Sequence, residues 1–271
     1  MELKVTRYEL ADNGVATVWL HRPDRGNSWT SRMHTEFRWI MGTLEPDPRV
    51  RVVVVTGSGK AFCVGADSQA LKGQAESGIY NPSVQEEALN PGYGVRPEFD
   101  ADMAWQLGYR VPIIAAVNGA CAGIGLAVVA FCDIRFGVEG AKITTAAPKL
   151  GLPAEYGLSW MLPRLIGSSH AADMLYSGRV VLAEELATMG FFNKVLPRAE
   201  FDDFVAAYAA MMASMSPTAV QMAKRQMQHD ILSNNPAESV ETSKAEITRM
   251  MKLPEYREGV QALLEKRPPK F

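Results

Sequence analysis

The chain opens with two strand-like runs, residues 3–10 and 15–20, which flank the polar triplet Asp12-Asn13-Gly14. Because Asn and Gly both accept positive φ, this triplet predicts a hairpin between antiparallel strands. A polar loop at residues 21–27 follows. Apolar residues at helical spacing then predict a helix whose first turn Ser31 caps.

Two continuous apolar runs, residues 50–56 and 112–117, are typical of strands that are buried on both faces of a parallel sheet. A small-residue helix at about 123–131 and a further strand at 134–137 follow the second run. The repeated order of strand, loop and helix predicts an α/β core.

The remaining segments suggest how the chain is divided. Residues 73–104 are rich in Gly, Pro, Asn and Glu and are long for a plain connection, which predicts a mobile flap. From Ser159 onward the pattern is mostly helical, with a short strand at 192–196. We therefore expect an α/β core with the site over residues 1–198 and a helical region over 199–271.

Composition narrows the class of protein. The 271 residues allow one large domain or two small ones. With 28 Lys and Arg against 30 Asp and Glu, the formal charge is −2, which argues against nucleic-acid and membrane-surface partners. The 3 cysteines have no CxxC spacing and indicate a reduced, cytoplasmic protein. The first residues lack a secretory signal, and no apolar run is long enough to span a bilayer.

Several familiar motifs are incomplete. Gly57-Ser-Gly-Lys60 lacks the spacing and the hydroxyl of a phosphate-binding loop, and Gly123-Ile-Gly125 lacks the third glycine of a dinucleotide fingerprint. Ser159 lacks the second glycine of a nucleophile elbow and is better explained as a helix start. The 4 histidines are scattered, so no metal site is expected.

Two Gly-rich stretches, residues 59–68 and 115–126, each follow one of the buried strands. Ligands bind at the carboxyl ends of strands in α/β sheets, where a helix begins. Two such loops side by side can direct backbone N–H groups at one oxygen atom and form an oxyanion hole. The alternative is that these glycines only permit tight turns.

These stretches, with others in the same order, resemble the crotonase family, also called the enoyl-CoA hydratase/isomerase family. The matching residues are 20–28, 61–67, 112–119, 132–134, 162–167, 257–259 and 265–267. The resemblance implies a spiral of ββα units with a helical C-terminal region that forms homotrimers, often paired into hexamers. It also implies an acyl-CoA substrate of fatty acid metabolism and no cofactor beyond the CoA moiety.

The resemblance implies roles for particular residues. The oxyanion donors fall on the backbone amides of Ala66 and Ile124, where an isoleucine replaces the usual glycine and narrows the pocket. The CoA moiety is expected to contact Arg22, Arg25, Ala61, Lys266 and Lys270, because phosphates bind such cations. The alternative for the two lysines is a solvated basic tail. Asp67 is better explained as a helix cap than as a catalytic group.

The acid/base group differs from that of paired-glutamate hydratases. Their two glutamates fall on Ala127 and on Ala147, or on Lys149 with a different gap. Glu155, in contrast, matches the aspartate of the isomerase branch, and its apolar neighbours should raise its pKa. The alternative for Glu155 is an N-cap or first-turn residue of the helix that begins near Ser159. Further carboxylates stand in the flap: Glu86, Glu87, Glu98, Asp100 and Asp102.

These observations predict an enoyl-CoA hydratase or isomerase that uses Ala66, Ile124 and Glu155 to form and protonate an enolate. Which of the two reactions occurs is left open by the residues. A non-catalytic acyl-CoA-binding protein is the first alternative, because Ala127 and Ala147 carry no carboxylate. A related acyl-CoA hydrolase or decarboxylase is the second.

Overall fold

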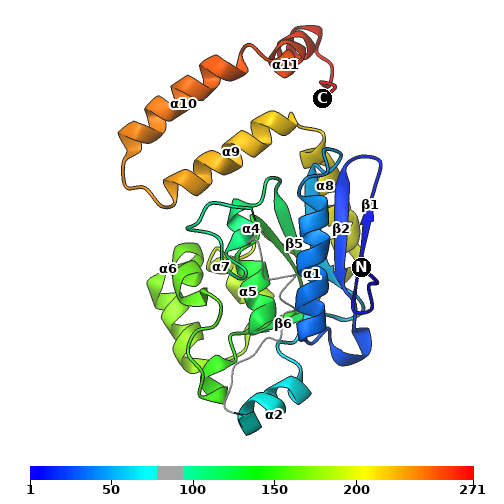
Figure 1. The fold of residues 1–271 in the computed structure, drawn as a ribbon, viewed down its shortest axis with the longest axis vertical. Coiled ribbons are helices and arrows are strands. Elements are labelled where there is room, and N and C mark those ends of the chain that lie inside the picture. Colours follow the sequence, from blue (N-terminus) through cyan, green and yellow to red (C-terminus); the bar gives the residue numbers. More distant parts are fainter. Residues whose placement is uncertain (78–93) are drawn as a thin grey trace.

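The computed structural model describes residues 1–77 and 94–271, and the predicted flap therefore lies partly outside the described residues. A six-stranded sheet forms the centre of the molecule in the order β1-β2-β3-β5-β7-β10 (Figure 1). Its strands are Thr6–Leu10, Val15–Leu20, Val52–Gly57, Ile113–Val117, Ile134–Val138 and Lys194–Leu196. All neighbours pair in parallel except β1 and β2. The α/β class of the predicted crotonase fold is confirmed.

The N-terminal hairpin forms as predicted, with Leu10 opposite Ala16 and Thr6 opposite Leu20. In its turn, Gly14 has a positive φ of 84°, whereas the Asn13 side chain accepts a hydrogen bond from the Val15 amide at 3.1 Å. Asn13 therefore stabilises the turn through its side chain, and only the glycine uses the left-handed conformation that the sequence allowed to both.

Helix α1 spans Ser31–Leu44, but its cap differs from the prediction. The hydroxyl of Thr30, not of Ser31, accepts the Met33 amide at 3.1 Å. Both residues can cap a helix, and the extended backbone of Thr30 decides between them, because an N-cap residue lies outside the helical conformation.

A second, smaller sheet has the order β4-β6-β8-β9, and the sequence pattern did not predict it. Its strands are Ala61–Cys63, Ala120–Ala122, Lys142–Thr144 and Val181–Leu182. Each is only two or three residues long, too short to show an alternating pattern. The two Gly-rich stretches therefore contain β4 and β6, and these short strands lie between β3 or β5 of the large sheet and the helix that follows.

Two glycines allow the chain to turn from the large sheet into the small one. A side chain on Gly57 would lie 2.1 Å from the carbonyl oxygen of Ala61, and one on Gly119 would lie 2.0 Å from that of Lys60. Such a contact with backbone leaves no room for a Cβ atom. Both positions require glycine because two chain segments cross there.

Helices cover both sheets, and α1 and α8 lie on opposite faces of the large one (Figure 1). After α1, the described helices are α2 (Ser68–Ser77), α4 (Trp105–Gly108), α5 (Ile124–Ala130) and α6 (Leu158–Ser177). They are followed by α7 (Ala183–Thr188) and α8 (Arg198–Ala213), and two short 3₁₀ turns, η1 and η2, lie at Pro23–Arg25 and Ala147–Leu150. The core is apolar and continuous across strands and helices, as expected for a parallel sheet covered on both faces.

Three helices, α9 (Pro217–Asp230), α10 (Pro236–Met250) and α11 (Pro254–Glu265), extend away from the two sheets (Figure 1). Lys224 attaches α9 to the core. Its buried ammonium group donates to the carboxylate of Asp133 at 2.7 Å and to the carbonyl oxygens of Gln106 and Val111 at 3.2 and 3.0 Å. All three ammonium protons are therefore used. The predicted division of the chain at residue 198 stays a prediction.

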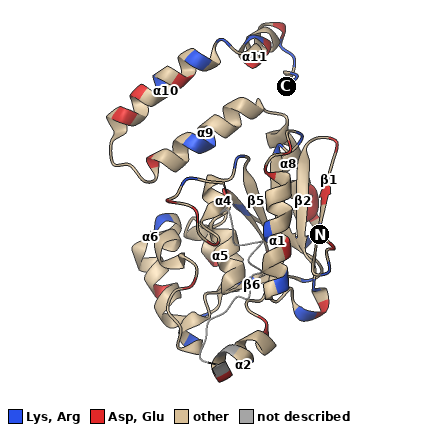
Figure 2. Cartoon of the chain, in the orientation of Figure 1, with Lys and Arg blue, Asp and Glu red and all other residues tan. Residues whose placement is uncertain are grey.

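Charges of both signs are mixed along α10 (Figure 2). Two pairs on this helix are Lys244 with Glu241 at 2.7 Å and Arg249 with Glu246 at 2.8 Å. Within the described ranges, the helices are either too short or too polar to cross a membrane.

Candidate active site

The two Gly-rich loops meet because β4 and β6 are parallel neighbours, with Cys63 beside Cys121. Gly65-Ala66-Asp67 follows β4 after one residue, Val64, and Gly123 follows β6 directly and precedes α5. Gly65 and Gly123 have φ values of 99° and 51°, which glycine adopts without strain. The shared strand direction, with a register shift between Ala61 and Cys63, thus brings Ala66 and Ile124 to one edge of the small sheet.

The backbone amide of Ala66 is left without a partner by the pairing of its neighbours. The Trp29 amide donates to the Gly65 carbonyl at 2.7 Å, and the Asp67 amide donates to the Trp29 carbonyl at 2.9 Å. This is the pattern of a parallel bridge, in which Ala66 directs its own N–H away from Trp29. The Ala66 amide donates to no group in the described residues.

The amide of Ile124 is available for a different reason. Ile124 is the first residue of α5, and the first amides of a helix have no acceptor within the helix. No acceptor for it exists elsewhere in ranges 1–77 and 94–271. The helix dipole adds a partial positive charge at this end.

Ala66, Ile124 and Glu155 line one cavity of about 150 Å³. Glu155 lies between η2 and α6, and one of its carboxylate oxygens is 3.2 Å from where a Cβ atom on Gly123 would stand. The cavity wall thus includes the three residues that the sequence singled out, and their catalytic roles stay a prediction. Gly123 is required both by its φ and by the space that Glu155 occupies.

Burial raises the pKa of Glu155 above its ordinary value. The carboxylate makes no hydrogen bond to the described part of the chain that would offset this effect. The cap of α6 is Gly157, so Glu155 is not the helix cap, and only its carbonyl oxygen bonds to the helix, at the Leu158 amide. A carboxyl group in this setting holds its proton to higher pH than an exposed glutamate does.

The positions expected for the two family glutamates are Ala127 and Ala147, or Lys149 with a different gap, and none of these is a carboxylate. Ala127 is fully buried in α5, and Ala147 lines the cavity. Neither can carry a proton. Among the described residues that line this cavity, Glu155 is therefore the only one with a carboxylate side chain.

Two further residues of the cavity wall, Trp29 and His34, were missed by the sequence analysis. Both are buried, and their rings meet edge to face at 6.1 Å. The His34 Nε2 atom lies 3.4 Å from an oxygen of Asp102, one of the carboxylates predicted in the flap. The inward face of α1 could have suggested His34, but no local motif marks it.

Asp67 caps α2, as predicted, by accepting the Gln69 amide at 3.0 Å. It also pairs with Arg22 at 3.0 Å. Burial acts to raise the pKa of Asp67, but hydrogen bonds from Gln69, Arg22 and Ser28 outweigh it and lower the pKa. Arg22 thereby fixes the polar loop against the Ala66 loop.

The other predicted CoA contacts occupy different places. Arg25 is exposed in η1, and Ala61, at the start of β4, accepts a hydrogen bond from the Asn27 side chain at 2.7 Å. Lys266 and Lys270 follow α11, at the end of the molecule far from α2 (Figure 1). The described chain thus brings together the predicted catalytic residues but not all predicted CoA contacts.

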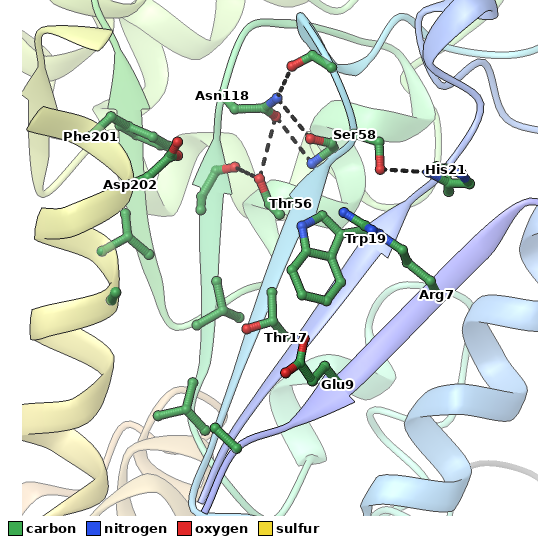
Figure 3. A pocket seen from close by; sticks show the side chains of 18 of the residues that line it. Arg7, Glu9, Thr17, Trp19, His21, Thr56, Ser58, Asn118, Phe201 and Asp202 are labelled. Atoms are coloured by element: carbon green, nitrogen blue, oxygen red, sulfur yellow. Dashed lines mark hydrogen bonds between the residues drawn. The ribbon is translucent and has the colours of Figure 1, made fainter. Parts of the chain in front are cut away.

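A larger cavity of about 810 Å³ lies between β1, β2, β3 and α8 (Figure 3). None of the predicted site residues lines it. Its polar groups are largely bonded to one another: His21 bonds Ser58 at 2.8 Å, and the Asn118 side chain donates to the carbonyls of Gly57 and Gly59. Size alone therefore does not mark the reactive site.

The three cysteines are buried, and burial raises the pKa of the Cys63 and Cys132 thiols to about 12. Such thiols are poor nucleophiles. In the part of the chain that the structure describes, no cluster of His, Cys, Asp and Glu could hold a metal ion.

The family model of enoyl-CoA hydratases/isomerases matches residues 11–271. The chain belongs to the enoyl-CoA hydratase/isomerase family. The predicted membership of the crotonase family is thereby confirmed.

Relatives within this family carry different activities. A "Probable enoyl-CoA hydratase" of Rhodobacter capsulatus is 32% identical over 272 residues, covering 100% of this chain and 99% of that protein. The 1,2-epoxyphenylacetyl-CoA isomerase of Escherichia coli K12 is 28% identical and covers 96% of this chain and 95% of its own length. The solved enoyl-CoA hydratase of Bacillus anthracis has a TM-score of 0.86 at 28% identity, covering 99% of each chain. Membership of the enoyl-CoA hydratase/isomerase family therefore fixes the fold but not the reaction.

Proposed function

We propose that this chain acts on an enoyl thioester of CoA and that its reaction passes through an enolate. One observation carries the proposal: two unpaired backbone amides, of Ala66 and Ile124, share a cavity with the half-buried carboxyl group of Glu155. The amides supply fixed donors for a carbonyl oxygen, and the carboxyl group moves a proton beside it.

The two amides act on the charge that develops during the reaction. When a bond forms or breaks at the carbon next to a thioester, negative charge accumulates on the thioester oxygen. Donors already in place stabilise that charge more than the neutral carbonyl, so they lower the barrier as well as bind. Ala66 and Ile124 provide such donors from two separate loops.

Glu155 is proposed as the acid/base group at the carbon next to the thioester. Its raised pKa keeps part of the population protonated closer to neutral pH, so it can either give or take a proton there. A single carboxyl group suits double-bond migration, in which one proton leaves one carbon and returns to another. Hydration requires a second group to activate water.

The CoA contacts remain part of the proposal. Arg25 is exposed and free of the Arg22–Asp67 pair, and Ala61 begins the strand that leads to Ala66. Since Lys266 and Lys270 lie at the other end of the molecule, we expect them to reach a CoA moiety only in a neighbouring copy of the chain (Figure 1).

We propose a homotrimer, or two such trimers paired into a hexamer, for the same reason. The C-terminal helices expose Ile247 on α10 and Leu263 and Leu264 on α11, with Leu263 77% and Leu264 78% exposed. Adjacent apolar side chains of this kind mark interaction surfaces. Sedimentation velocity distinguishes a trimer or hexamer from a monomer, and a monomer at micromolar concentration would contradict the proposal.

A non-catalytic acyl-CoA-binding protein is the second candidate, because Ala127 and Ala147 replace both family glutamates. Glu155→Gln separates the two. Under the first proposal, turnover of a panel of linear and aromatic 2-enoyl-CoA thioesters falls by roughly 10²–10⁴-fold in this variant, while CoA-ester binding persists. Wild-type protein that binds the panel but converts none of it would favour the binding protein. Release of free CoA or CO₂ would instead indicate a hydrolase or decarboxylase.

A further inference from the structure

The cavity contains a second group that can carry a proton, the imidazole of His34. This residue lies in the first turn of α1, is only 3% exposed and lines the same cavity as Glu155. Glu155 comes from the loop before α6, so the two groups reach the cavity from different elements.

The two ring nitrogens of His34 have different surroundings. Nε2 is sealed from water and lies 3.4 Å from a carboxylate oxygen of Asp102, without the geometry of a hydrogen bond. Nδ1 forms no hydrogen bond within the described ranges. It is also not one of the buried side-chain atoms that lack a hydrogen-bond partner, so it is not fully buried. The small surface that His34 retains therefore includes Nδ1, and His34 is one of the residues that line the cavity.

This arrangement suits a base better than a structural residue. A carboxylate facing one nitrogen favours the proton on that side and leaves the lone pair on the other nitrogen. When the second nitrogen accepts a proton, the same carboxylate stabilises the imidazolium. A purely structural buried histidine would be expected to have its nitrogens hydrogen-bonded.

We propose that His34, positioned by Asp102, is the base that activates water, and that the reaction at this site is hydration of a 2-enoyl-CoA. The inference rests on the proposed function, because it uses the same two amides and Glu155. It assigns to His34 the second role that hydration requires and that neither Ala127 nor Ala147 can perform.

The proposed reaction adds one water molecule across the double bond of the enoyl group. His34 Nδ1 takes a proton from water as the water oxygen bonds to the β carbon. The π electrons of the double bond move to the thioester oxygen, where the amides of Ala66 and Ile124 hold the enolate. Protonated Glu155 then gives its proton to the α carbon, and the carbonyl re-forms. The proton on His34 returns to Glu155 through solvent, so one water molecule is added to give a 3-hydroxyacyl-CoA.

The test uses two reactions that need different groups. Hydration of the enoyl-CoA panel is followed by loss of the conjugated thioester absorbance and by identification of the 3-hydroxy product. Exchange of the α protons of the matching saturated acyl-CoA with deuterated water is followed by mass spectrometry. Exchange needs the amides and Glu155 but not a water-activating base.

We expect His34→Asn to lower kcat for hydration by roughly 10²-fold or more and to leave α-proton exchange within about threefold of the wild type. Glu155→Gln lowers both reactions. Asp102→Asn lowers kcat for hydration by about tenfold with little change in KM, as expected for a positioning residue. His170→Asn, at an exposed site on α6, is the matched control and changes neither reaction.

His34→Ala provides a second route, because added imidazole should restore hydration in the space that the side chain leaves. Thermal unfolding verifies that each variant is folded. If His34→Asn hydrates at the wild-type rate while Glu155→Gln does not, the proposed function stands and the role of His34 is wrong. The same holds if the wild type yields only double-bond isomers. If the wild type neither converts enoyl-CoA nor exchanges α protons, the proposed function itself fails.

Discussion

The main chain of Trp29 bonds to both neighbours of Ala66, and the amide of Ala66 itself has no partner within residues 1–77 and 94–271. Trp29 donates to Gly65 and accepts from Asp67, so the intervening N–H faces the other way. Trp29 lies 37 positions before Ala66 in the sequence. The open donor is therefore a consequence of a contact between two loops, not of the Gly-rich motif alone.

Ile124→Pro should remove one oxyanion donor while preserving α5. Proline is tolerated at the first position of a helix, where the amide has no helical partner. We expect kcat on the best enoyl-CoA substrate to fall by about 10²–10³-fold. Ile124→Ala keeps the amide and should retain most of the activity. Equal losses in the two variants would mean that the side chain, and not the N–H, matters at this position.

Glu155→Gln should change the pH dependence of stability. Because burial raises the pKa of Glu155, the native state binds the proton more tightly than the unfolded chain. The contribution of this carboxyl group to wild-type stability is then lost as pH rises from the ordinary glutamate pKa through the raised value. The glutamine of the variant does not titrate. The variant should therefore gain in melting temperature over the wild type as pH increases above the ordinary glutamate pKa. A gap independent of pH would contradict this prediction.

Glu258→Gln should change the pH dependence of stability in the direction opposite to that of Glu155→Gln. Hydrogen bonds from Arg267 and from the Lys270 amide lower the pKa of Glu258 to about 2. Its stabilising effect is present above the ordinary glutamate pKa and is lost as pH falls toward about 2. The wild type should therefore exceed this variant in melting temperature near neutral pH, and the difference should shrink in acid. A difference that persists at the lowest accessible pH would argue against the pairing.

Gly125→Ala should disturb helix α5, which begins with the Ile124 amide, because the added methyl group overpacks the core there. A Cβ atom at this position would lie 2.7 Å from both the Cβ and the carbonyl oxygen of Cys63. We expect a loss of about 1–3 kcal/mol in the free energy of unfolding, measured in urea, together with reduced turnover. Gly42→Ala in α1 is the matched control, because nothing lies within 4 Å of its Cβ position. That variant should gain about 0.5–1 kcal/mol.

Lys224→Met should loosen the attachment of α9 to the core. The substitution leaves Asp133 without its ammonium partner and two carbonyl oxygens without a donor. Breaking one side of a buried pair costs about 3–5 kcal/mol, which urea unfolding measures. Lys244→Met, in the exposed pair with Glu241, should cost less than about 1 kcal/mol. Similar values for both variants would show that the Lys224 contacts contribute little.

Much of the α/β core could be predicted from the sequence, because its signals are local. Continuous apolar runs produced β3 and β5, and Asp12-Asn13-Gly14 produced the hairpin turn. The helical spacing after residue 198 likewise became α8 to α11. Each of these patterns is repeated within a few residues, so neighbouring side chains alone determine it.

The chemistry of the site was only partly predictable. The Gly-rich loops marked Ala66 and Ile124, and the order of the motifs marked Glu155, because these residues sit at fixed positions within local motifs. No local pattern indicated the short second sheet, the bridge between Trp29 and Ala66 or the approach of Asp102 to His34.

The sequence by itself determined the class of fold, the family and the loops that carry the amides. Only the tertiary structure decided which amides stay unpaired and which side chains share the cavity. The physical reason is that an unpaired donor or a buried imidazole is defined by what packs against it. At this site those partners come from segments tens of residues apart, which only folding brings together.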